Sequence, residues 1–588
     1  MSGSPGNLFT TVAGYMDNIL PADNTMKVLL LDESTLNVIS MVRSQTFLLS
    51  RGVFLVARVE YHWQRQCMKN MRCIVFIRPQ VSSVSAVCNE LNNPKYENYE
   101  IYFSAAASSE LLDSLARADA KRLVNRVCEV FCDFAALNAD AFITAAAVPN
   151  ALFPALVSAT SLRLVAEGIA STFVAHRRRP YVRYDQRSTF ARNLAMELNE
   201  VLQKNIELYD YKSKDSVFLI LDRSSDVLTP LVMQWTYQSM LHEHIGLNYN
   251  RLRLPSTLAS TTQQGDEENG EYVFSPNDDS FFAANMFANW GDLCANIKEY
   301  VEKCKSTLDI DRDTATVDEI RDYVQRMSQT KYLAGSVEKH TTVVTHISSE
   351  VKRRALLETS LLEQHMVVTN DPTGHWNRLQ EFVSKRNHSG GVSEGVADVS
   401  DLVRLCLIYH LKYEKPHQPS RVAETLNSLG PNLAKYLRKL QQYHGERPTD
   451  ELFGETGVLA SIVKTFVDSG NVYTQHEAVL KRTLLQLFSG KLPLEQYPYL
   501  TASSTGHAAT SASHQPQQPS TFKPKDVTAF MCGGFTYAEA AIVNSINSGT
   551  AYSGSAASGL PQGGVRACIG GTGVLNSESF LGMLEAYA

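Results

Sequence analysis

The chain contains 588 residues and carries a formal net charge of −6. Its length predicts about three or four domains, and its acidic balance argues against the broad basic face of a nucleic-acid-binding protein. The ten cysteines have no regular spacing, which favours buried thiols in a reducing compartment over a disulfide framework.

In the first quarter of the chain, four short apolar runs alternate with segments of helical periodicity. The runs are residues 26–32, 52–59, 72–78 and 99–104. Strands separated by helices are typical of a parallel sheet that helices cover on both faces. The sequence therefore predicts one α/β domain over residues 1–140.

Within this first domain, residues 108–131 carry two apolar stripes at helical spacing. Leu112 and Leu115 form one stripe, and Val124 and Val127 form the other. Two short helices with these stripes can leave an apolar groove between them. The same spacing is also typical of ordinary core residues, so both interpretations stay open.

Residues 141–162 contain no charge and are about long enough to span a bilayer. Pro149 and Pro154 interrupt the segment, which favours a buried loop and helix over a spanning helix. The first residues also lack the basic and then apolar pattern of a signal peptide. We therefore expect a cytoplasmic protein.

The most informative segment is residues 216–246. Its apolar run 217–221 is typical of a strand that is buried on both faces, and Asp222 and Arg223 follow the run directly. No nucleophile elbow stands at the end of this strand, in contrast to many α/β hydrolases. The segment therefore combines a buried strand with a polar turn that lacks a nucleophile.

A helix is expected in the second half of this segment. Thr229 and Pro230 have the order of an N-cap and a first helical residue, and Gly246 is a suitable end. Trp235 would lie on this helix. We expect its indole to pack across the junction between the middle domain and the helical segment that follows.

The second sheet resumes only near the C-terminus, where residues 527–534 and 565–571 are short apolar runs that end in glycine. A mostly helical block lies between, over residues 247–480. The sequence therefore predicts a middle domain made of residues 141–246 plus 481–588, interrupted by a helical insertion.

Residues 321–354 of the insertion predict a long helix or a helical hairpin. Apolar residues and one histidine recur there at alternating steps of four and three, which is typical of a coiled-coil seam. Packing against a neighbouring helix of the same domain explains the spacing equally well. The seam consists of Leu333, Val337, His340, Val344, Ile347 and Val351.

Three segments are poor in large apolar residues and rich in Ser, Gly, Gln and Pro. They are residues 255–271, 502–526 and 549–564. Such segments cannot build a core, so we expect surface loops or disorder.

The motifs of a nucleotide-dependent or hydrolytic enzyme are missing from the sequence. It contains no Walker A loop, no dinucleotide fingerprint and no zinc-protease motif. After the glycine pair at 533–534, Thr536 and Glu539 have capping-box spacing, which would place a carboxylate where a phosphate would have to bind. His242 and His244 are two residues apart and do not share a helical face. We expect no catalytic residue, no cofactor and no metal site.

Several motifs in order along the chain resemble the Sec/Munc (SM) family. They are RCIVFIRP, LDRSSDVLTPL, QWTYQSMLHEHIG, VTAFMCGGFTYAEA and VRACIGGTGVLNSESF. The resemblance covers nearly the whole chain. It implies an arch-shaped α/β fold of three domains, with two parallel-sheet domains and a mainly helical insertion.

The resemblance also implies a function. SM proteins bind syntaxin-type SNAREs and assembled SNARE complexes, and they promote specific SNARE pairing before membrane fusion. The motifs resemble most those family members that act in vesicle transport on the endosomal, trans-Golgi and vacuolar route. The resemblance also implies that the protein is a monomer and is recruited to membranes through SNAREs. The alternatives are a nucleotide- or sugar-dependent enzyme with an unrecognised α/β site and a generic tethering scaffold.

Carried onto this sequence, the family's binding surfaces fall at three places. Leu112, Leu115, Val124 and Val127 match the pocket for the N-terminal peptide of a syntaxin. Asp32 matches an acidic residue of the syntaxin-binding cleft, although a strand-end cap is an equally good interpretation. Asn37 replaces an arginine of the neuronal members. The seam residues Leu333, Val337, Val344, Ile347 and Val351 match the hairpin that can template SNARE helices.

Overall fold

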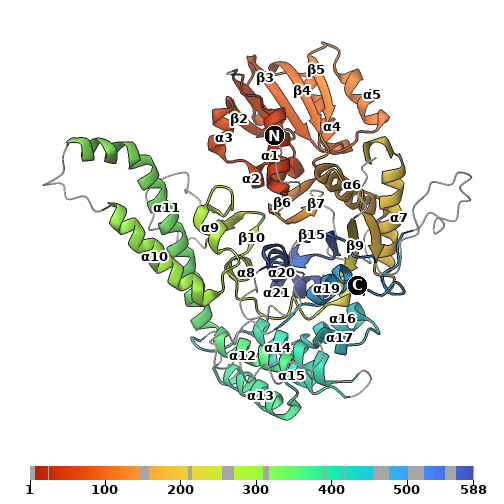
Figure 1. The fold of residues 1–588 in the computed structure, drawn as a ribbon, viewed down its shortest axis with the longest axis vertical. Coiled ribbons are helices and arrows are strands. Elements are labelled where there is room, and N and C mark those ends of the chain that lie inside the picture. The colour runs from red at the N-terminus through yellow and green to blue at the C-terminus, as the bar shows by residue number, and fades with distance from the viewer. Residues whose placement is uncertain are drawn as a thin grey trace, which may run out of the picture.

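The computed structural model describes residues 7–586, except 24, 145–157, 205, 210–214, 255–270, 309–316, 390–392, 416–418, 454–475, 501–521 and 550–563. Figure 1 shows the first sheet at one end of the molecule, the second sheet in the centre and a group of helices at the other end. Two long helices, α10 and α11, project to one side.

The first sheet is entirely parallel, with the strand order β2-β1-β3-β4-β5. Alternate residues of β1 enter different cores, because successive side chains of a strand point to opposite faces. The predicted strands are confirmed, and a fifth strand is added. The bounds are β1 Lys27–Leu31, β2 Val53–Arg58, β3 Met68–Ile77, β4 Tyr96–Phe103 and β5 Val124–Glu129.

Helices cover both faces of this sheet. One face packs against α1 (Leu8–Ile19), α2 (Glu33–Val42) and α3 (Gln45–Ser50) in a core that continues into the second sheet. The other face packs against α4 (Val81–Asn92) and α5 (Ser109–Ala118) in a smaller core of its own. The first sheet is therefore anchored to the rest of the molecule through one face only.

The second sheet has the order β6-β7-β15-β13-β9-β8 and is parallel apart from the β6–β7 pair. Its first strand, β6, precedes residue 140, so the second sheet begins earlier than the sequence suggested. The bounds are β6 Phe134–Asn138, β7 Ala141–Thr144, β8 Tyr181–Tyr184, β9 Ser216–Asp222, β13 Asp526–Cys532 and β15 Arg566–Gly571. The other elements around it are α6 Ala159–His176, α7 Thr189–Lys204, α19 Val479–Phe488, α20 Tyr537–Ser548 and α21 Ser577–Ala586, with β14 Phe535–Thr536 paired to β16 Val574–Leu575.

A buried ion pair joins the two chain segments that build this sheet. The two terminal nitrogens of the Arg223 guanidinium, Nη1 and Nη2, donate to Glu539 at 3.0 and 2.7 Å, and both side chains are fully buried. Glu539 also forms the predicted capping box with Thr536 at the start of α20. One carboxylate therefore caps a helix and neutralises an arginine that follows β9.

The helical insertion begins with a small antiparallel sheet and continues as helices. α10 and α11 form a hairpin, so the hairpin arm includes α10 and is not confined to residues 321–354, which lie mostly within one helix. The bounds are β10 Leu247–Asn248, β11 Arg251–Arg253, β12 Glu271–Val273, α9 Ser280–Asn285, α10 Trp290–Leu308, α11 Val317–Arg353, α12 Leu356–Val368, α13 Pro372–Ser389, α14 Val399–Tyr413, α15 Arg421–Leu429, α16 Ala434–His444 and α17 Asp450–Phe453.

The helix expected from Pro230 is wrong. Residues 226–235 form turns and an extended segment, and the helix α8 runs only over Tyr237–His244. Asp226 accepts hydrogen bonds from the backbone nitrogen of Thr229 at 3.0 Å and from its hydroxyl at 2.6 Å. Thr229 is thus held in a local turn and does not act as a helix N-cap.

Most of the three segments predicted as loops, at 255–271, 502–526 and 549–564, lie outside the described residues. Their ends are described: Glu271 belongs to β12 and Asp526 begins β13. Among the described helices, none is both long and apolar enough to cross a bilayer. The N-terminal part of the uncharged segment 141–162 forms β7, and its C-terminal end lies in α6.

Replacing Glu539 with Gln should destabilise the protein strongly. The substitution keeps the size of the side chain but removes the closer countercharge of the buried Arg223 and leaves only Asp226, at 3.9 Å. Breaking a buried ion pair typically costs about 3–5 kcal/mol. Urea unfolding followed by circular dichroism measures the change. Glu381→Gln is the matched control, because Glu381 pairs with Arg378 on the surface and should contribute less than about 1 kcal/mol. Equal unfolding midpoints for the two variants would contradict the role of the pair.

Candidate functional site

Hydrogen bonds of the Asp222 side chain stabilise the polar turn after β9. One oxygen of Asp222 accepts from the backbone nitrogen and hydroxyl of Ser224 at 2.9 and 2.8 Å, and the other accepts from Ser188 at 2.5 Å. Asp222 and Arg223 are both buried. These two residues are therefore structural and are not accessible to a partner.

The extended segment that follows the turn connects the second sheet to the helical insertion. Pro230 is buried in it, and the carbonyl of Leu231 accepts from Arg404 of α14 at 2.8 Å. The backbone nitrogen of Met233 donates to Glu363 of α12 at 2.8 Å. Trp235 is only 2% exposed, and its indole nitrogen donates to Ser360 at 2.7 Å. Trp235 therefore packs across the predicted junction.

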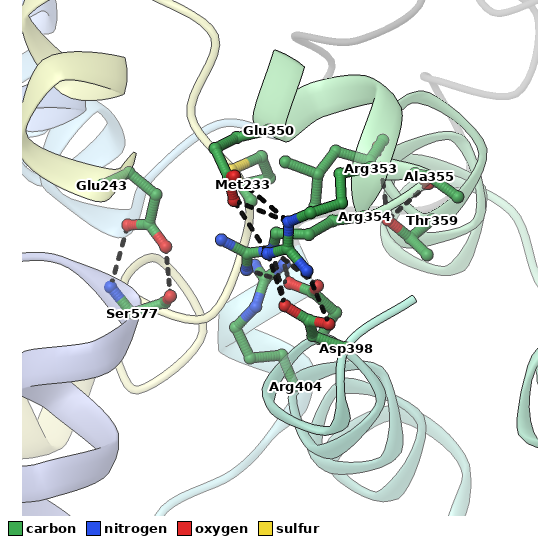
Figure 2. Close-up of polar contacts among 12 residues, drawn as sticks. Met233, Glu243, Glu350, Arg353, Arg354, Ala355, Thr359, Asp398, Arg404 and Ser577 are labelled. Carbon is green, nitrogen blue, oxygen red and sulfur yellow. Dashed lines mark hydrogen bonds and ion pairs between the residues drawn. The ribbon is translucent and has the colours of Figure 1, made fainter. Parts of the chain in front are cut away.

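An ionic network fixes the base of α11, as Figure 2 shows. Arg353 donates to Asp398 at 2.9 Å and to Glu350 at 2.8 Å. Arg354 and Arg404 share Asp401 at 2.6 and 3.0 Å. Ala355 has a left-handed backbone conformation, with φ of 50°, where the chain turns from α11 into α12. The angle between the hairpin and the helical group is thus set by paired charges around a sharp turn.

One anionic member of this network has an unusual environment. Glu363 is fully buried, and burial raises its pKa to about 7, although Arg404 at 3.1 Å acts in the opposite direction. The backbone nitrogen of Met233 also holds the carboxylate. Glu363 therefore couples α12 both to α14 and to the segment that contains Trp235.

The predicted seam of α11 faces its own domain. Over residues 332–353, where the side chains of this helix are described, the buried ones are Ser336, His340, Val343, Ile347 and Val351, while Leu333, Val337 and Val344 are half-buried. Ile347 and Val351 are therefore core residues, and they are not free to contact a SNARE helix. Of the five residues assigned to templating, only the half-buried three retain exposed surface.

His340 does not weaken helix pairing along α11, because its side chain hydrogen bonds within its own domain. Its Nδ1 lies 2.6 Å from the hydroxyl of Tyr237 in α8, and its Nε2 lies 2.9 Å from Asp279, which precedes α9. Burial lowers the pKa of His340, against the opposing effect of Asp279. This histidine locks α11 onto α8 and α9, which explains why a polar residue occupies the buried face.

The candidate peptide pocket lies at one edge of the first sheet, where α5 packs beside β5 (Figure 1). Val124 and Val127 belong to this strand, so the expectation of a second helix is wrong. A shift in register pairs Val124 with Tyr99 and Val127 with Ile101, which keeps both valines on the face that α5 covers.

The four residues of this pocket differ in exposure. Leu115 is buried in the core, and Val124 packs against that core. Leu112 is 37% exposed and Val127 is 43% exposed. The surface that remains for a partner at this edge therefore centres on Leu112 and Val127.

The assignment of Asp32 to a binding cleft is wrong, and the alternative of a strand-end cap is correct. Its side chain is fully buried and forms a capping box with Thr35 at the start of α2. Its second oxygen accepts from the backbone nitrogen of Arg78 at 2.8 Å and from Ser83 at 2.7 Å. Asn37 is half-buried beside the side chain of Tyr249, where α2 meets the insertion.

A group of exposed apolar residues, which the sequence did not reveal, lies around β2, the other edge strand of the first sheet. Tyr61 and Trp63 pack edge to face at 5.7 Å, and Trp63 is 73% exposed. Figure 1 shows β2 and α3 on the same side of the molecule as α10 and α11. No periodicity distinguishes exposed from buried residues in such a strand. The group consists of Leu49, Phe54, Val56, Tyr61 and Trp63.

The described residues contain no cluster of histidine, cysteine and carboxylate side chains that could hold a metal ion. His242 accepts from the backbone nitrogen of Leu247 at 3.2 Å, and burial lowers its pKa. Burial lowers the pKa of His244 to about 4. Both histidines are packed at the end of α8, as the sequence suggested.

Comparison with known proteins identifies the family. The Sec1 family model matches residues 27–583. The chain belongs to the Sec1, or SM, family. Vacuolar protein sorting-associated protein 45 from Dictyostelium discoideum is 30% identical, over 99% of this chain and 97% of the relative. The protein of the same name from Homo sapiens is 33% identical, over 98% and 95%.

Solved structures of SM proteins agree with this fold. The structure of "SM Protein Vps45 in Complex with Qa SNARE Tlg2" superposes with a TM-score of 0.82 at 32% identity, covering 98% of both chains. The Unc18–syntaxin 1 complex from Monosiga brevicollis has a TM-score of 0.73 at 18% identity, over 98% of this chain and 99% of that one. The α/β SM fold expected from the sequence is confirmed.

Truncation of Trp235 to Ala should loosen the junction on which this SM fold depends. Loss of a buried tryptophan typically costs about 3–5 kcal/mol, and the hydrogen bond to Ser360 is lost as well. Differential scanning calorimetry measures the change. The control is Trp63→Ala, an equal truncation at an exposed site, which should leave the melting temperature unchanged. If both variants melt like the parent, Trp235 does not support the junction.

Proposed function

We propose that this SM protein is a non-enzymatic regulator that binds a syntaxin-type SNARE and promotes correctly paired SNARE assembly on the endosomal and trans-Golgi route. The observation that best supports this proposal is the similarity, over nearly the full length, to a solved structure of Vps45 in complex with a Qa SNARE. Pull-downs with the cytoplasmic domains of all syntaxins of the cell test the proposal. Retention of none of them by the folded protein would refute it.

The first contact in this proposal is an apolar anchor of the syntaxin N-terminal peptide between α5 and β5. Leu112 and Val127 are exposed apolar side chains at that edge, and Leu115 and Val124 form the floor beneath them. A short peptide needs few anchors, because a micromolar complex corresponds to only about 8 kcal/mol. An apolar surface formed by these few side chains is therefore sufficient to bind a short peptide with micromolar affinity.

Leu112→Arg should abolish binding of the syntaxin N-terminal peptide and leave the fold intact. A charged group in an apolar contact costs several kcal/mol, which is a large part of the binding free energy of a micromolar peptide. Isothermal titration calorimetry with the peptide measures the affinity. Val81→Arg, at an exposed valine that begins α4, is the matched control and should bind normally. Normal affinity of a folded Leu112→Arg variant would remove the pocket assignment.

The second contact would lie between the β2 edge and the hairpin of α10 and α11. The exposed residues Phe54, Val56 and Trp63 offer apolar surface there, and Leu333, Val337 and Val344 are half-buried on α11. A surface that binds one SNARE arrangement more tightly than its alternatives shifts the population toward that arrangement. Such differential binding requires no catalytic group.

Val344→Asp should slow SNARE-driven liposome fusion and leave binding of the syntaxin N-terminal peptide unchanged. A carboxylate at this half-buried position would repel an apolar helix from α11. Thr345→Asp adds the same charge at the exposed neighbour and serves as the control. Equal fusion rates for the two variants would refute the templating role. If Val344→Asp unfolds the protein, the residue belongs to the core.

Two other functions make different predictions. A nucleotide- or sugar-dependent enzyme should be stabilised against heat by its ligand, whereas a SNARE regulator should not. A tethering scaffold should retain vesicle coats or small GTPases without direct affinity for SNAREs. We propose a cytoplasmic monomer that reaches endosomal and Golgi membranes through its SNARE partners.

A further inference from the structure

The starts of the parallel strands in the second sheet lie side by side, at the edge opposite to Arg223 and Glu539. The register pairs Ser216 of β9 with Asp526 of β13, and Asp526 with Arg566 of β15. Tyr181 of β8 pairs with Val217, one residue further along β9. The residues that precede these strands therefore converge, although they come from widely separated parts of the chain.

This edge gathers positive charge in a protein whose overall charge is −6. Two of its arginines are paired, Arg178 with Asp526 and Arg566 with Asp140. Among the described residues, Asp215 is a further carboxylate at the strand starts, near Arg178. The remaining cations make no ion pair within the described part of the chain, and we call them the basic edge: Arg177, Arg179, Lys523 and Lys525.

A half-buried imidazole, that of His176, lies beside the basic edge. His176 ends α6, and its Nε2 has no hydrogen-bond partner among the described residues. Burial, with Arg566 and Arg178 nearby, lowers the pKa of His176 to about 3. The pKa of Arg178 is also lowered, by burial and then by Arg566. The electrostatic potential around His176 and Arg178 therefore remains positive, although Arg178 and Arg566 are each paired with a carboxylate.

Aromatic side chains border the same edge. The rings of Tyr181 and Phe522 meet edge to face at 5.9 Å, and Tyr499 packs on the other side of Tyr181 at 6.3 Å. All three are half-buried. Tyr181 begins β8 close to Arg179, and Phe522 precedes Lys523 directly. Half-buried aromatic rings beside cations are typical of surfaces that contact the headgroup region of a membrane.

We propose that the basic edge is a docking surface for an anionic membrane, with its cations on lipid phosphates and its aromatic border at the headgroup level. The C-terminus of α6 favours a positive charge close to it, which is a structural reason for the arginine at its end, Arg177. This reason does not apply to Lys523 and Lys525, which belong to another segment. Several cations within a Debye length of an anionic leaflet attract it additively. The proposal goes beyond SNARE binding, because it gives the protein a contact with lipid itself.

The test is co-sedimentation of the full chain with SNARE-free vesicles. The parent should bind phosphatidylcholine vesicles that contain phosphatidylserine and a phosphatidylinositol phosphate, should not bind pure phosphatidylcholine, and should be released by salt. The double variant Lys523→Ala with Lys525→Ala should lose about 25-fold in vesicle partition, since each cation near the surface contributes a factor of about five. Its syntaxin affinity should equal that of the parent.

The matched control removes two exposed lysines from the helical insertion, by Lys298→Ala with Lys352→Ala. It has the same net charge as the test variant and should bind vesicles like the parent. Equal losses in the two double variants would overturn the proposal in favour of nonspecific attraction. Absence of binding by the parent would also overturn it, as would binding of soluble inositol hexakisphosphate without binding of vesicles.

Discussion

The pairing of Arg223 with Glu539 is the constraint on which the architecture rests. The chain leaves the second sheet after β9, builds the whole helical insertion and returns as β13 and α20. A fully buried guanidinium must find a countercharge, and among the described residues Glu539 provides a two-pronged one at 3.0 and 2.7 Å, while Asp226 lies farther away at 3.9 Å. Because the same carboxylate caps α20, an error in the return of the chain would leave both a charge and a helix end unsatisfied.

The segment 226–235, which follows Arg223, fixes the position of the insertion relative to the second sheet. Its backbone binds Arg404 and Glu363, and Trp235 binds Ser360. The charges at the base of α11 and the triad of Tyr237, His340 and Asp279 then fix the hairpin from two sides. The candidate SNARE surfaces are therefore carried by a framework whose parts are rigidly related. Such a framework suits a protein that acts by preferring one arrangement of its partners.

The candidate site was only partly predictable from the sequence. Leu112 and Leu115 were recognisable as a helical stripe, but the sequence did not reveal that a strand carries Val124 and Val127, because a valine-rich run suits either element. Asp32 followed a strand and preceded a helix, so a cap and a cleft residue looked alike until both of its oxygens were seen to be occupied. The exposed group around Trp63 has no periodic signal, since an edge strand exposes residues that a central strand would bury.

The sequence by itself determined the local elements and the class of fold, because apolar runs, capping boxes and family motifs act over short distances. It indicated four strands of the first sheet, the strands β9, β13 and β15 of the second sheet and the cap of α20 correctly, but it did not indicate β5, β6, β7 or β8. The tertiary structure alone decided which ends of those strands meet. It brought Arg179, Lys525 and Arg566 to one edge, turned Ile347 and Val351 into the core, and paired Arg223 with Glu539. These outcomes depend on sheet register and on contacts between distant segments, which no short window of sequence contains.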